Sequence, residues 1–236
     1  MTDRGKVALV TGGNKGIGFE VARQLAQLNH RVVIGSRDEE RGRTAAEKLR
    51  SEGADASYVV LDVSDPDSVT AAIQQLARLD VLINNAATAP PEGPPSEVPL
   101  DVLKRTYDTN VFGLVAVTQA ALPLLRKSEA GRIVNLSSGA GSLTIVSRPD
   151  WRPEWNGLAY NTSKTAVNAI TVAFATELRK TPIKVNAVNP GYTKTDMSPT
   201  ATRPATQAAT VVVHYATLPP DGPSGTFQDE SGPIPW

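Results

Sequence analysis

The sequence predicts a single α/β domain built on one doubly wound parallel sheet with helices on both of its faces. Three observations support this prediction: short apolar runs alternate with amphipathic helical segments, a glycine-rich turn joins the first run to the first helix, and no internal repeat interrupts the alternation. A chain of 236 residues is long enough for one large core of this kind. We therefore expect residues 1–236 to form one domain.

The order of the elements begins with the apolar run 7–10, which ends near Gly12 and is followed by apolar residues at helical spacing over 16–28. This pattern of a strand, a turn and a helix recurs along the chain. The expected strands are residues 7–10, 31–35, 58–61, 81–83, 132–136 and 184–188, and the expected helices are residues 16–28, 38–52, 64–79, 100–127 and 158–179. Such an alternation needs right-handed crossovers and a parallel sheet, so we expect a Rossmann-like fold of about seven strands.

Two segments break the alternation before the last expected helix. Residues 90–99 contain five prolines and are expected to form a surface loop, because proline cannot continue a helix. Residues 139–157, which include Trp151 and Trp155, are expected to form an irregular insertion that overhangs the site.

The C-terminal region, residues 190–236, is rich in proline, threonine and alanine. We expect it to supply a substrate loop and a turn-rich tail, with a helix over 205–217 and a last short strand at 226–228. No second domain is predicted there.

The composition limits the classes of partner. Lysine and arginine together number 24, as do aspartate and glutamate, so no net charge favours nucleic acid or an anionic membrane, and neither is expected as a partner. The chain has no cysteine and only two histidines, His30 and His214, which leaves little material for a metal site, and none is predicted. Residues 1–6 are charged and lead directly into the first strand, so we expect no signal peptide and a cytoplasmic location.

The glycine turn 11–18 follows a strand and opens a helix, the context in which such a motif binds phosphate. Its spacing differs from the dinucleotide-binding pattern G-x-G-x-x-G, because three residues separate Gly12 from Gly16. A plain turn at the start of a helix is the alternative. The candidate cofactor-binding residues of this turn are Gly12, Asn14, Lys15, Gly16, Ile17 and Gly18.

The choice between NAD and NADP depends on the end of the second strand, where a carboxylate on the ribose would favour NAD. Ser36 stands there and Arg37 follows it, while Lys15 lies in the glycine turn. Both cations could reach a 2′-phosphate, Arg37 through a forked contact, which favours NADP(H). Solvated surface cations are the alternative, and Asp38 keeps NAD open.

Tyr160 and Lys164 are four residues apart in an expected helix, so their side chains leave the same face. An adjacent ammonium favours the phenolate and would lower the tyrosine pKa, and the pair could then exchange a proton with a carbonyl or alcohol oxygen. Taken alone, such a pair is a weak signal, because it is more often a tyrosine on a helix beside a solvated lysine.

Together these elements resemble the short-chain dehydrogenase/reductase family over nearly the whole chain. The resemblance rests on motifs that occur in the family's order: Thr11-Gly12-x-x-x-Gly16-Ile17-Gly18, Asp62-Val63, Asn84-Asn85-Ala86-Ala87, Asn110, Ser137-Ser138, Tyr160-x-x-x-Lys164 and Pro190-Gly191. Residues 14–18, 189–197 and 232–236 are similar to the NADPH-dependent carbonyl reductase branch.

The resemblance implies four catalytic residues. Tyr160 would be the acid and base, Lys164 would bind the nicotinamide ribose and lower the tyrosine pKa, and Ser138 would hold the substrate oxygen. Asn110 would position a water that links Lys164 to solvent. Asn110 could instead brace the backbone, and Ser138 could merely end a strand.

The resemblance also implies further cofactor contacts, to which Tyr160 and Lys164 contribute. Asp62 and Val63 would contact the adenine, Asn84 and Ala86 would line the cofactor cleft, and Pro190, Gly191, Thr193 and Thr195 would flank the nicotinamide. A bracing role is the alternative for Asn84.

Two departures from the family pattern bear on the substrate. Ala87 replaces a common glycine, and more residues separate Ser138 from Tyr160 than in compact members. Trp151 and Trp155 in the longer segment could line a pocket for a bulky apolar carbonyl compound, with Tyr192 as a further candidate. Packing of the tryptophans onto the body is an equal alternative. A homodimer or homotetramer is compatible with the family, and a monomer stays open.

The predicted activity is NADPH-dependent reduction of a ketone or aldehyde to an alcohol. One alternative is an NADP(H)-sensing protein that binds the dinucleotide without catalysis. Another is a dehydrogenase of the same fold that acts on a sugar alcohol, a steroid or an acyl-carrier substrate.

Overall fold

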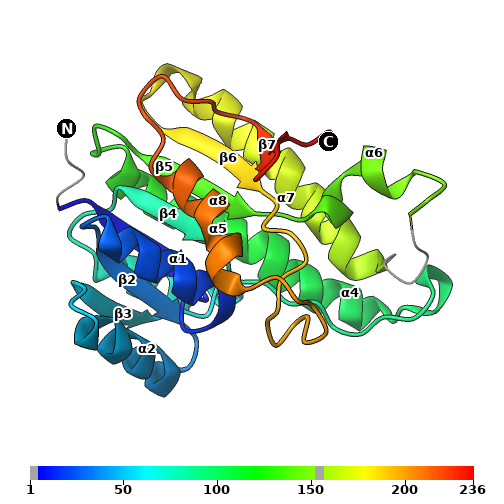
Figure 1. Ribbon diagram of the computed structural model, residues 1–236, viewed down its shortest axis with the longest axis horizontal. Coiled ribbons are helices and arrows are strands. Elements are labelled where there is room, and N and C mark those ends of the chain that lie inside the picture. The colour runs from blue at the N-terminus through cyan, green and yellow to red at the C-terminus, as the bar shows by residue number, and fades with distance from the viewer. Residues whose placement is uncertain (1–4, 152–156) are drawn as a thin grey trace.

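The computed structural model describes residues 5–151 and 157–236 and contains one sheet of eight strands (Figure 1). The strands are β1 (Val7–Thr11), β2 (Arg31–Ser36), β3 (Ala56–Val60), β4 (Val81–Asn84), β5 (Arg132–Leu136), β6 (Lys184–Val188), β7 (Phe227–Asp229) and β8 (Gly232–Pro233). Their order is β3-β2-β1-β4-β5-β6-β7-β8, and all pairs are parallel except β7 with β8. The predicted Rossmann-like sheet is confirmed, and the two-residue strand β8 adds to the seven strands expected.

The helices follow the predicted order. They are α1 (Gly16–Gln27), α2 (Glu39–Ser51), α3 (Pro66–Gln74), α4 (Leu100–Tyr107), α5 (Gly113–Leu125), α6 (Leu143–Val146), α7 (Leu158–Glu177) and α8 (Ala205–Ala216). Asp38 caps α2 by accepting from the N–H of Arg41, and Asp65 caps α3 with proline at its first position. Helix α3 ends earlier than expected, because the chain turns to bury Leu79 before β4.

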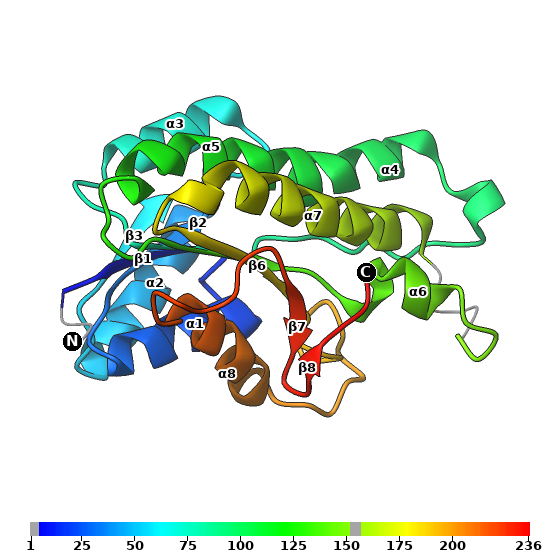
Figure 2. The same cartoon turned by 90° about the horizontal axis from the view of Figure 1, so that it is seen from above.

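The helices cover the two faces of the sheet (Figure 2). Helices α1, α2 and α8 pack on one face, where Leu25, Ile34 and Val212 are fully buried. Helices α3, α5 and α7 pack on the other face over residues such as Leu82 and Ile133. With apolar side chains on both faces, the strands are buried throughout, as a parallel sheet requires.

The long helix expected over 100–127 contains a turn of π-helix, Asp108–Phe112, between α4 and α5. Such a turn inserts a residue and often marks a functional position. Within the part of the chain that the structure describes, Leu100–Leu125 is also the one stretch long and apolar enough to cross a membrane by length and composition. Half of it is buried in the protein, and α5 packs against α3 and β4, as a core helix does.

The two interrupting segments are more regular than the sequence suggested. The loop 90–99 contains a turn of 3-10 helix at Pro95–Glu97, where the prolines occupy the first positions that tolerate them. Residues 139–151 contain a 3-10 turn and helix α6. Helix α6 is held by the C-terminal tail, because Thr144 N–H donates to the carbonyl of Trp236 and the Ser142 hydroxyl donates to that of Pro235.

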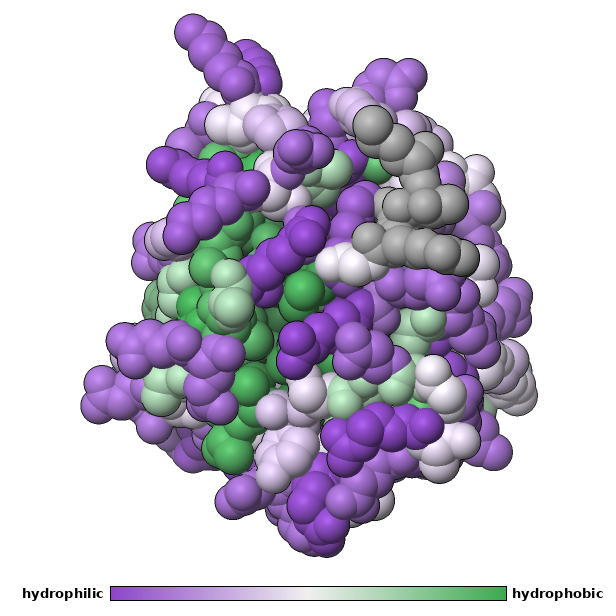
Figure 3. Space-filling model, turned by 90° about the vertical axis from the view of Figure 1, so that its left-hand side faces the viewer, coloured by the Kyte–Doolittle hydropathy of each residue, from purple (hydrophilic) through white to green (hydrophobic). Residues whose placement is uncertain are grey.

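The end of the sheet where the strands begin shows apolar surface bordered by charged side chains (Figure 3). Asp80, which is 1% exposed, anchors this end. Its carboxylate accepts hydrogen bonds from Val7 N–H, from the Ser128 hydroxyl and from Arg78. Burial by itself would raise the pKa of Asp80, but these donors outweigh it and hold the pKa below its usual value.

We expect Asp80→Asn to lower the free energy of unfolding by about 2–3 kcal/mol at neutral pH, because the variant loses a charge-assisted acceptor. The folded pKa of Asp80 lies below the unfolded one, so its contribution is present above the unfolded pKa and is lost as the pH falls through the folded pKa. Urea unfolding at neutral and acidic pH measures this. Equal losses at both pH values would contradict the assignment.

Candidate active site

A cleft of about 890 Å³ opens at the carboxyl ends of the strands. Its wall contains the glycine turn, the ends of β2, β4 and β5, part of α7 and the loop after β6. Crevices outside the carboxyl ends of an open α/β sheet are where such folds bind ligands, and the volume suits a dinucleotide with a small substrate.

The glycine turn has the geometry of a phosphate cradle. Gly12 has φ +62° and Gly16 has φ +57°, which side chains rarely adopt. A Cβ on Gly12 would lie 3.1 Å from Ala86 Cα, and one on Gly16 would lie 3.4 Å from the Thr195 side chain. Gly12, Asn14, Lys15, Gly16 and Ile17 all line the cleft at the start of α1. Because these glycines carry no side chain, the cleft is open beside the first turn of α1, and the backbone N–H groups of that turn could bind a pyrophosphate there.

Gly18 has a different place from its neighbours. It is not among the described residues that line the cleft; a Cβ there would lie 2.5 Å from Asn85 Nδ2, so its role is to let α1 approach β4 closely. The Asn85 amide donates to the carbonyls of Thr11 and Gly12 at 2.8 and 3.1 Å and fixes the turn. Sequence reasoning missed this role of Asn85, although it stands in a quoted motif.

The end of β2 forms the basic part of the cleft. Ser36, Arg37, Asp38 and Arg41 line it, and Arg37 is exposed. The Asp38 carboxylate caps α2, so it is already engaged by the Arg41 N–H. Arg41 was missed by the sequence analysis, although its position four residues after Arg37 was the available signal.

Lys15 lies in the cleft wall and pairs with Asp196 at 2.6 Å, across the mouth of the cleft. Both side chains are more than half exposed, so the pair contributes little to stability. Asp62 and Val63 also line the cleft, and the Asp62 carboxylate accepts from the N–H and the hydroxyl of Ser64.

The predicted catalytic residues Tyr160 and Lys164 are among the described residues that line the inner end of the cleft, whereas Ser138 is not and its neighbour Ser137 is. Tyr160 and Lys164 lie on the first turns of α7 and line the cleft. The hydroxyl of Ser138, just after β5, hydrogen-bonds to the Tyr160 hydroxyl. Lys164 Nζ lies 5.7 Å from the centre of the Tyr160 ring and donates to the carbonyl of Leu136 at 2.8 Å.

The expected lowering of the tyrosine pKa is wrong for this structure. Burial raises the pKa of Tyr160 above its usual value, and the hydrogen bond to Ser138 lowers it by less. Burial also lowers the pKa of Lys164 to about 8, so its ammonium loses part of its charge near neutral pH. The two side chains do lie near each other, with Lys164 Nζ 5.7 Å from the centre of the Tyr160 ring, but burial is the largest cause of the shift in the Tyr160 pKa, and its direction is upward.

Asn84 and Asn110, which were expected to serve the cleft, hydrogen-bond to neighbouring parts of the protein instead. Asn110 lies in the π-helical turn and bonds both backbone groups of Thr88, at 2.8 and 2.9 Å, and the Ser163 hydroxyl at 3.0 Å. The buried Asn84 amide donates to Asn135 and Thr118, which ties β4 to β5 and α5. Neither residue is among the described residues that line the cleft, so the bracing alternative describes both side chains.

The loop after β6 is only partly in the cleft. Pro190 and Thr195 line it. Gly191 has φ +77°, and the buried Thr193 hydroxyl donates to the carbonyl of Gly191, so both residues shape the loop behind the wall.

Of the aromatic residues expected to bind substrate, Trp151 and Tyr192 are not among the described residues that line the cleft. Tyr192 is 64% exposed, with its hydroxyl bonded to Thr200, and Trp151 lies beyond α6. Trp155 lies outside the described residues. One face of α4 forms this wall instead, through Val102, Arg105 and Thr106, and Thr109 in the π-helical turn continues it. The helical spacing of these four residues was the signal in the sequence, but nothing local showed which face meets the cleft.

A phosphate cradle and a Ser-Tyr-Lys group at one edge of a Rossmann-like sheet define a dinucleotide-dependent oxidoreductase. A family model described as short chain dehydrogenase matches residues 6–205. The chain belongs to the short-chain dehydrogenase family.

Several relatives of the chain are reductases. Carbonyl reductase [NADPH] 1 of Mus musculus is 33% identical, with the whole of both chains covered. Salutaridine reductase of Papaver bracteatum is also 33% identical, over 95% of this chain and 94% of that protein. The crystal structure of an NADPH-bound carbonyl reductase from chicken fatty liver has a TM-score of 0.86 and 28% identity, and covers 99% of this chain and 100% of that one.

Proposed function

We propose that this protein reduces ketones or aldehydes to alcohols with NADPH. The observation that carries the proposal is that Tyr160 and Lys164 line one end of a cleft whose other end is the glycine turn, with Ser138 near enough to the Tyr160 phenol to lower its pKa. The similarity to carbonyl and salutaridine reductases over nearly full length supports it.

In the proposed mechanism the substrate oxygen accepts hydrogen bonds from Ser138 and Tyr160, which fixes the carbonyl carbon within the cleft. NADPH, when bound, supplies the hydride that this carbon accepts. Tyr160 gives its proton to the oxygen as negative charge develops there. The raised pKa of Tyr160 keeps the phenol protonated at neutral pH, as a proton donor in the reduction direction requires.

Lys164 restores the proton in this scheme. Its Nζ is held by the Leu136 carbonyl on the cleft side of α7, and a pKa of about 8 lets it exchange protons near neutral pH. The water relay through Asn110 stays a prediction.

The preference for NADP(H) rests on the charges at the end of β2. Arg37 and Arg41 face this part of the cleft, and Asp38, the carboxylate that kept NAD open, is engaged in capping α2. A 2′-phosphate would meet cations there rather than a free carboxylate. The NADPH-bound carbonyl reductase that this chain resembles supports the same choice.

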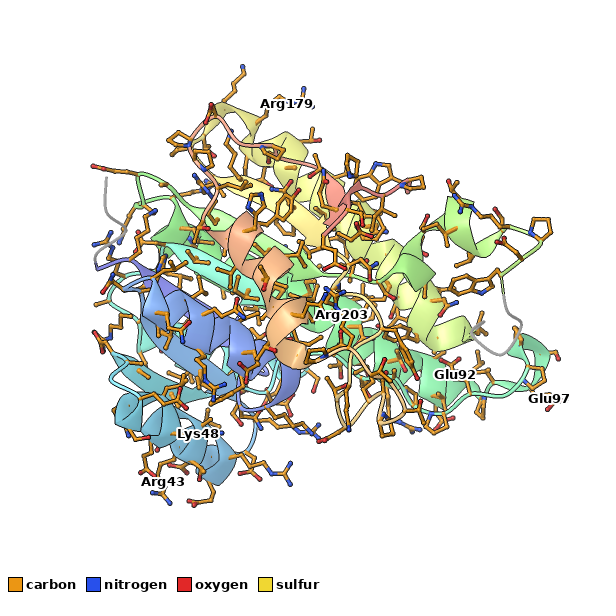
Figure 4. All side chains as sticks on the ribbon, in the orientation of Figure 1. Arg43, Lys48, Glu92, Glu97, Arg179 and Arg203 are labelled. Carbon is orange, nitrogen blue, oxygen red and sulfur yellow. The ribbon has the colours of Figure 1, made fainter. Side chains whose placement is uncertain are left out.

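We expect Arg37→Ala to raise the dissociation constant for NADPH at least tenfold, about 1.4 kcal/mol, with much less effect on NADH. Fluorescence titration with both nucleotides measures this. Arg43→Ala is the control, because Arg43 lies on the outer face of α2 and pairs with Glu40 and Glu47 (Figure 4). Equal losses for both nucleotides would contradict the assignment of Arg37.

The substrate end of the cleft is lined by Ala89, Pro90, Val102 and Met197, with Thr106 and Arg105 beside them. This wall suits a carbonyl compound with apolar substituents. The test is to follow NADPH and NADH consumption with a panel of ketones, aldehydes and quinones. NADPH-dependent turnover of at least one carbonyl class supports the proposal, and nucleotide binding without turnover across the panel would favour the sensing protein instead.

We also propose that the protein acts in the cytoplasm and that a dimer or tetramer is compatible with its fold. Sugar alcohols, steroids and acyl-carrier compounds remain candidate substrates of the same mechanism, and including them in the panel separates them from simple carbonyl compounds.

A further inference from the structure

Glu92 makes an unexpected contact with the catalytic helix. It lies in the proline-rich loop after β4, yet its two carboxylate oxygens accept hydrogen bonds from the backbone N–H groups of Ala159 and Tyr160, at 2.7 and 3.0 Å. These are donors of the first turn of α7, which have no partner within the helix. Figure 4 places Glu92 beside the start of α7 and Glu97 farther out on the same loop.

Helix α7 needs a cap from elsewhere. Its N-cap is Gly157, which has no side chain to accept from these N–H groups, and its first turn contains no acidic residue. A carboxylate at this end satisfies two N–H groups and complements the partial positive charge of the helix. A Cβ on Gly157 would lie 3.0 Å from Glu92 Oε1, so a larger N-cap residue would compete with the carboxylate for this space.

The same loop forms part of the cleft wall through residues 86–90. It is fixed at Thr88 by two hydrogen bonds with Asn110, and at Glu92 by two hydrogen bonds from the backbone of α7. Glu92 therefore joins the cleft wall to the backbone of the residue that faces the substrate oxygen.

We propose that Glu92 is a positioning residue for carbonyl reduction, which caps the first turn of α7 and holds Tyr160 against Ser138. The inference rests on the proposed function. The inference goes beyond the proposed function because Glu92 contacts neither the substrate oxygen nor the glycine turn.

The test compares Glu92→Ala, Glu92→Gln and Glu97→Ala in steady-state reduction. We expect Glu92→Ala to lower kcat at least tenfold with the KM for NADPH within twofold, because the adenosine end is untouched. Glu92→Gln retains an acceptor oxygen and is expected to recover kcat to within about threefold of the wild type. Glu97→Ala, on the exposed part of the same loop, should match the wild type. A Glu92→Ala enzyme that turns over within twofold of the wild type, or a Glu97→Ala enzyme that loses as much, would overturn the inference.

A second readout does not need turnover. Amide hydrogen exchange of Ala159 and Tyr160 reports the two backbone hydrogen bonds that Glu92 accepts. Both amides should exchange at least tenfold faster in Glu92→Ala than in the wild type and in Glu97→Ala, and unchanged exchange would contradict the proposed contact. If the wild type reduces no carbonyl compound, the proposed function fails and this exchange measurement still decides the role of Glu92. If Glu92→Ala does not fold, Glu92→Gln and Glu92→Asp test the role of Glu92 in its place. The aspartate side chain is one methylene shorter, so its carboxylate lies farther from α7, and Glu92→Asp should lower kcat more than Glu92→Gln.

Discussion

Tyr160→Phe is expected to lower kcat for carbonyl reduction by about 10²–10⁴-fold, the range that a positioned general acid contributes. The Tyr160 hydroxyl lies beside Ser138 at the inner end of the cleft, and phenylalanine keeps the ring but has no proton to give. The cradle at the other end is unchanged, so the dissociation constant for NADPH should stay within a few fold of the wild type. Stopped-flow single turnovers and nucleotide titration measure the two quantities separately.

The control for this prediction is Tyr192→Phe. Tyr192 also carries a phenol near the loop after β6, but it is 64% exposed and its hydroxyl bonds Thr200. We expect wild-type turnover from this variant. Retention of near-normal turnover by Tyr160→Phe on a true substrate would refute the mechanism.

The pH dependence of carbonyl reduction by the wild type is a second test of Tyr160 as the proton donor. Burial raises the pKa of Tyr160, so the phenol stays protonated through neutral pH and reduction should fall only at alkaline pH, as the proton is lost. Alcohol oxidation needs the phenolate and should rise over the same alkaline range. A fall in the reduction rate between slightly acidic and neutral pH that disappears in Tyr160→Phe would contradict this direction.

Lys164→Met has the second largest expected effect, a loss of about 100-fold or more in kcat, together with a gain in stability. The activity falls because the group that returns a proton to Tyr160 is removed. The stability rises because Lys164 is 4% exposed and burial lowers its pKa from 10.5 to about 8, so folding the charged lysine costs free energy at neutral pH. Methionine fills similar space without that cost, and we expect a gain of about 1–3 kcal/mol after the loss of the hydrogen bond to Leu136.

The predicted gain in the free energy of unfolding can be checked by measuring it at several pH values. The folded pKa of Lys164 lies below the unfolded one, so between about 8 and 10.5 the unfolded chain binds more protons and the wild type gains stability as the pH rises. Lys164→Met should lack this gain, so the difference between the two proteins should shrink toward alkaline pH in urea unfolding. Lys127→Met, at an exposed position just after α5, is the control and should change neither activity nor stability. A Lys164→Met protein less stable than the wild type at neutral pH would contradict the assigned cost of burial.

Much of the site could be predicted because it follows from spacing within single elements. Tyr160 and Lys164 share a face of α7 because they are one helical turn apart, and Gly12 and Gly16 adopt left-handed backbone because they join β1 to α1. The substrate wall could not be found this way. Val102 in α4 and Thr109 in the π-helical turn have helical spacing, but only the packing of α4 against α7 directs this face to the cleft.

By itself, the sequence determined the order of strands and helices, the glycine turn and the spacing of Tyr160 and Lys164, because each depends on residues that are neighbours along the chain. The tertiary structure decided the rest. It brought Glu92 to the backbone of Tyr160 from 68 positions away, and it turned Lys164 Nζ toward the Leu136 carbonyl. It also reversed the expected shift in the tyrosine pKa, because the solvation of a buried group depends on everything that packs around it and not on its sequence neighbours alone.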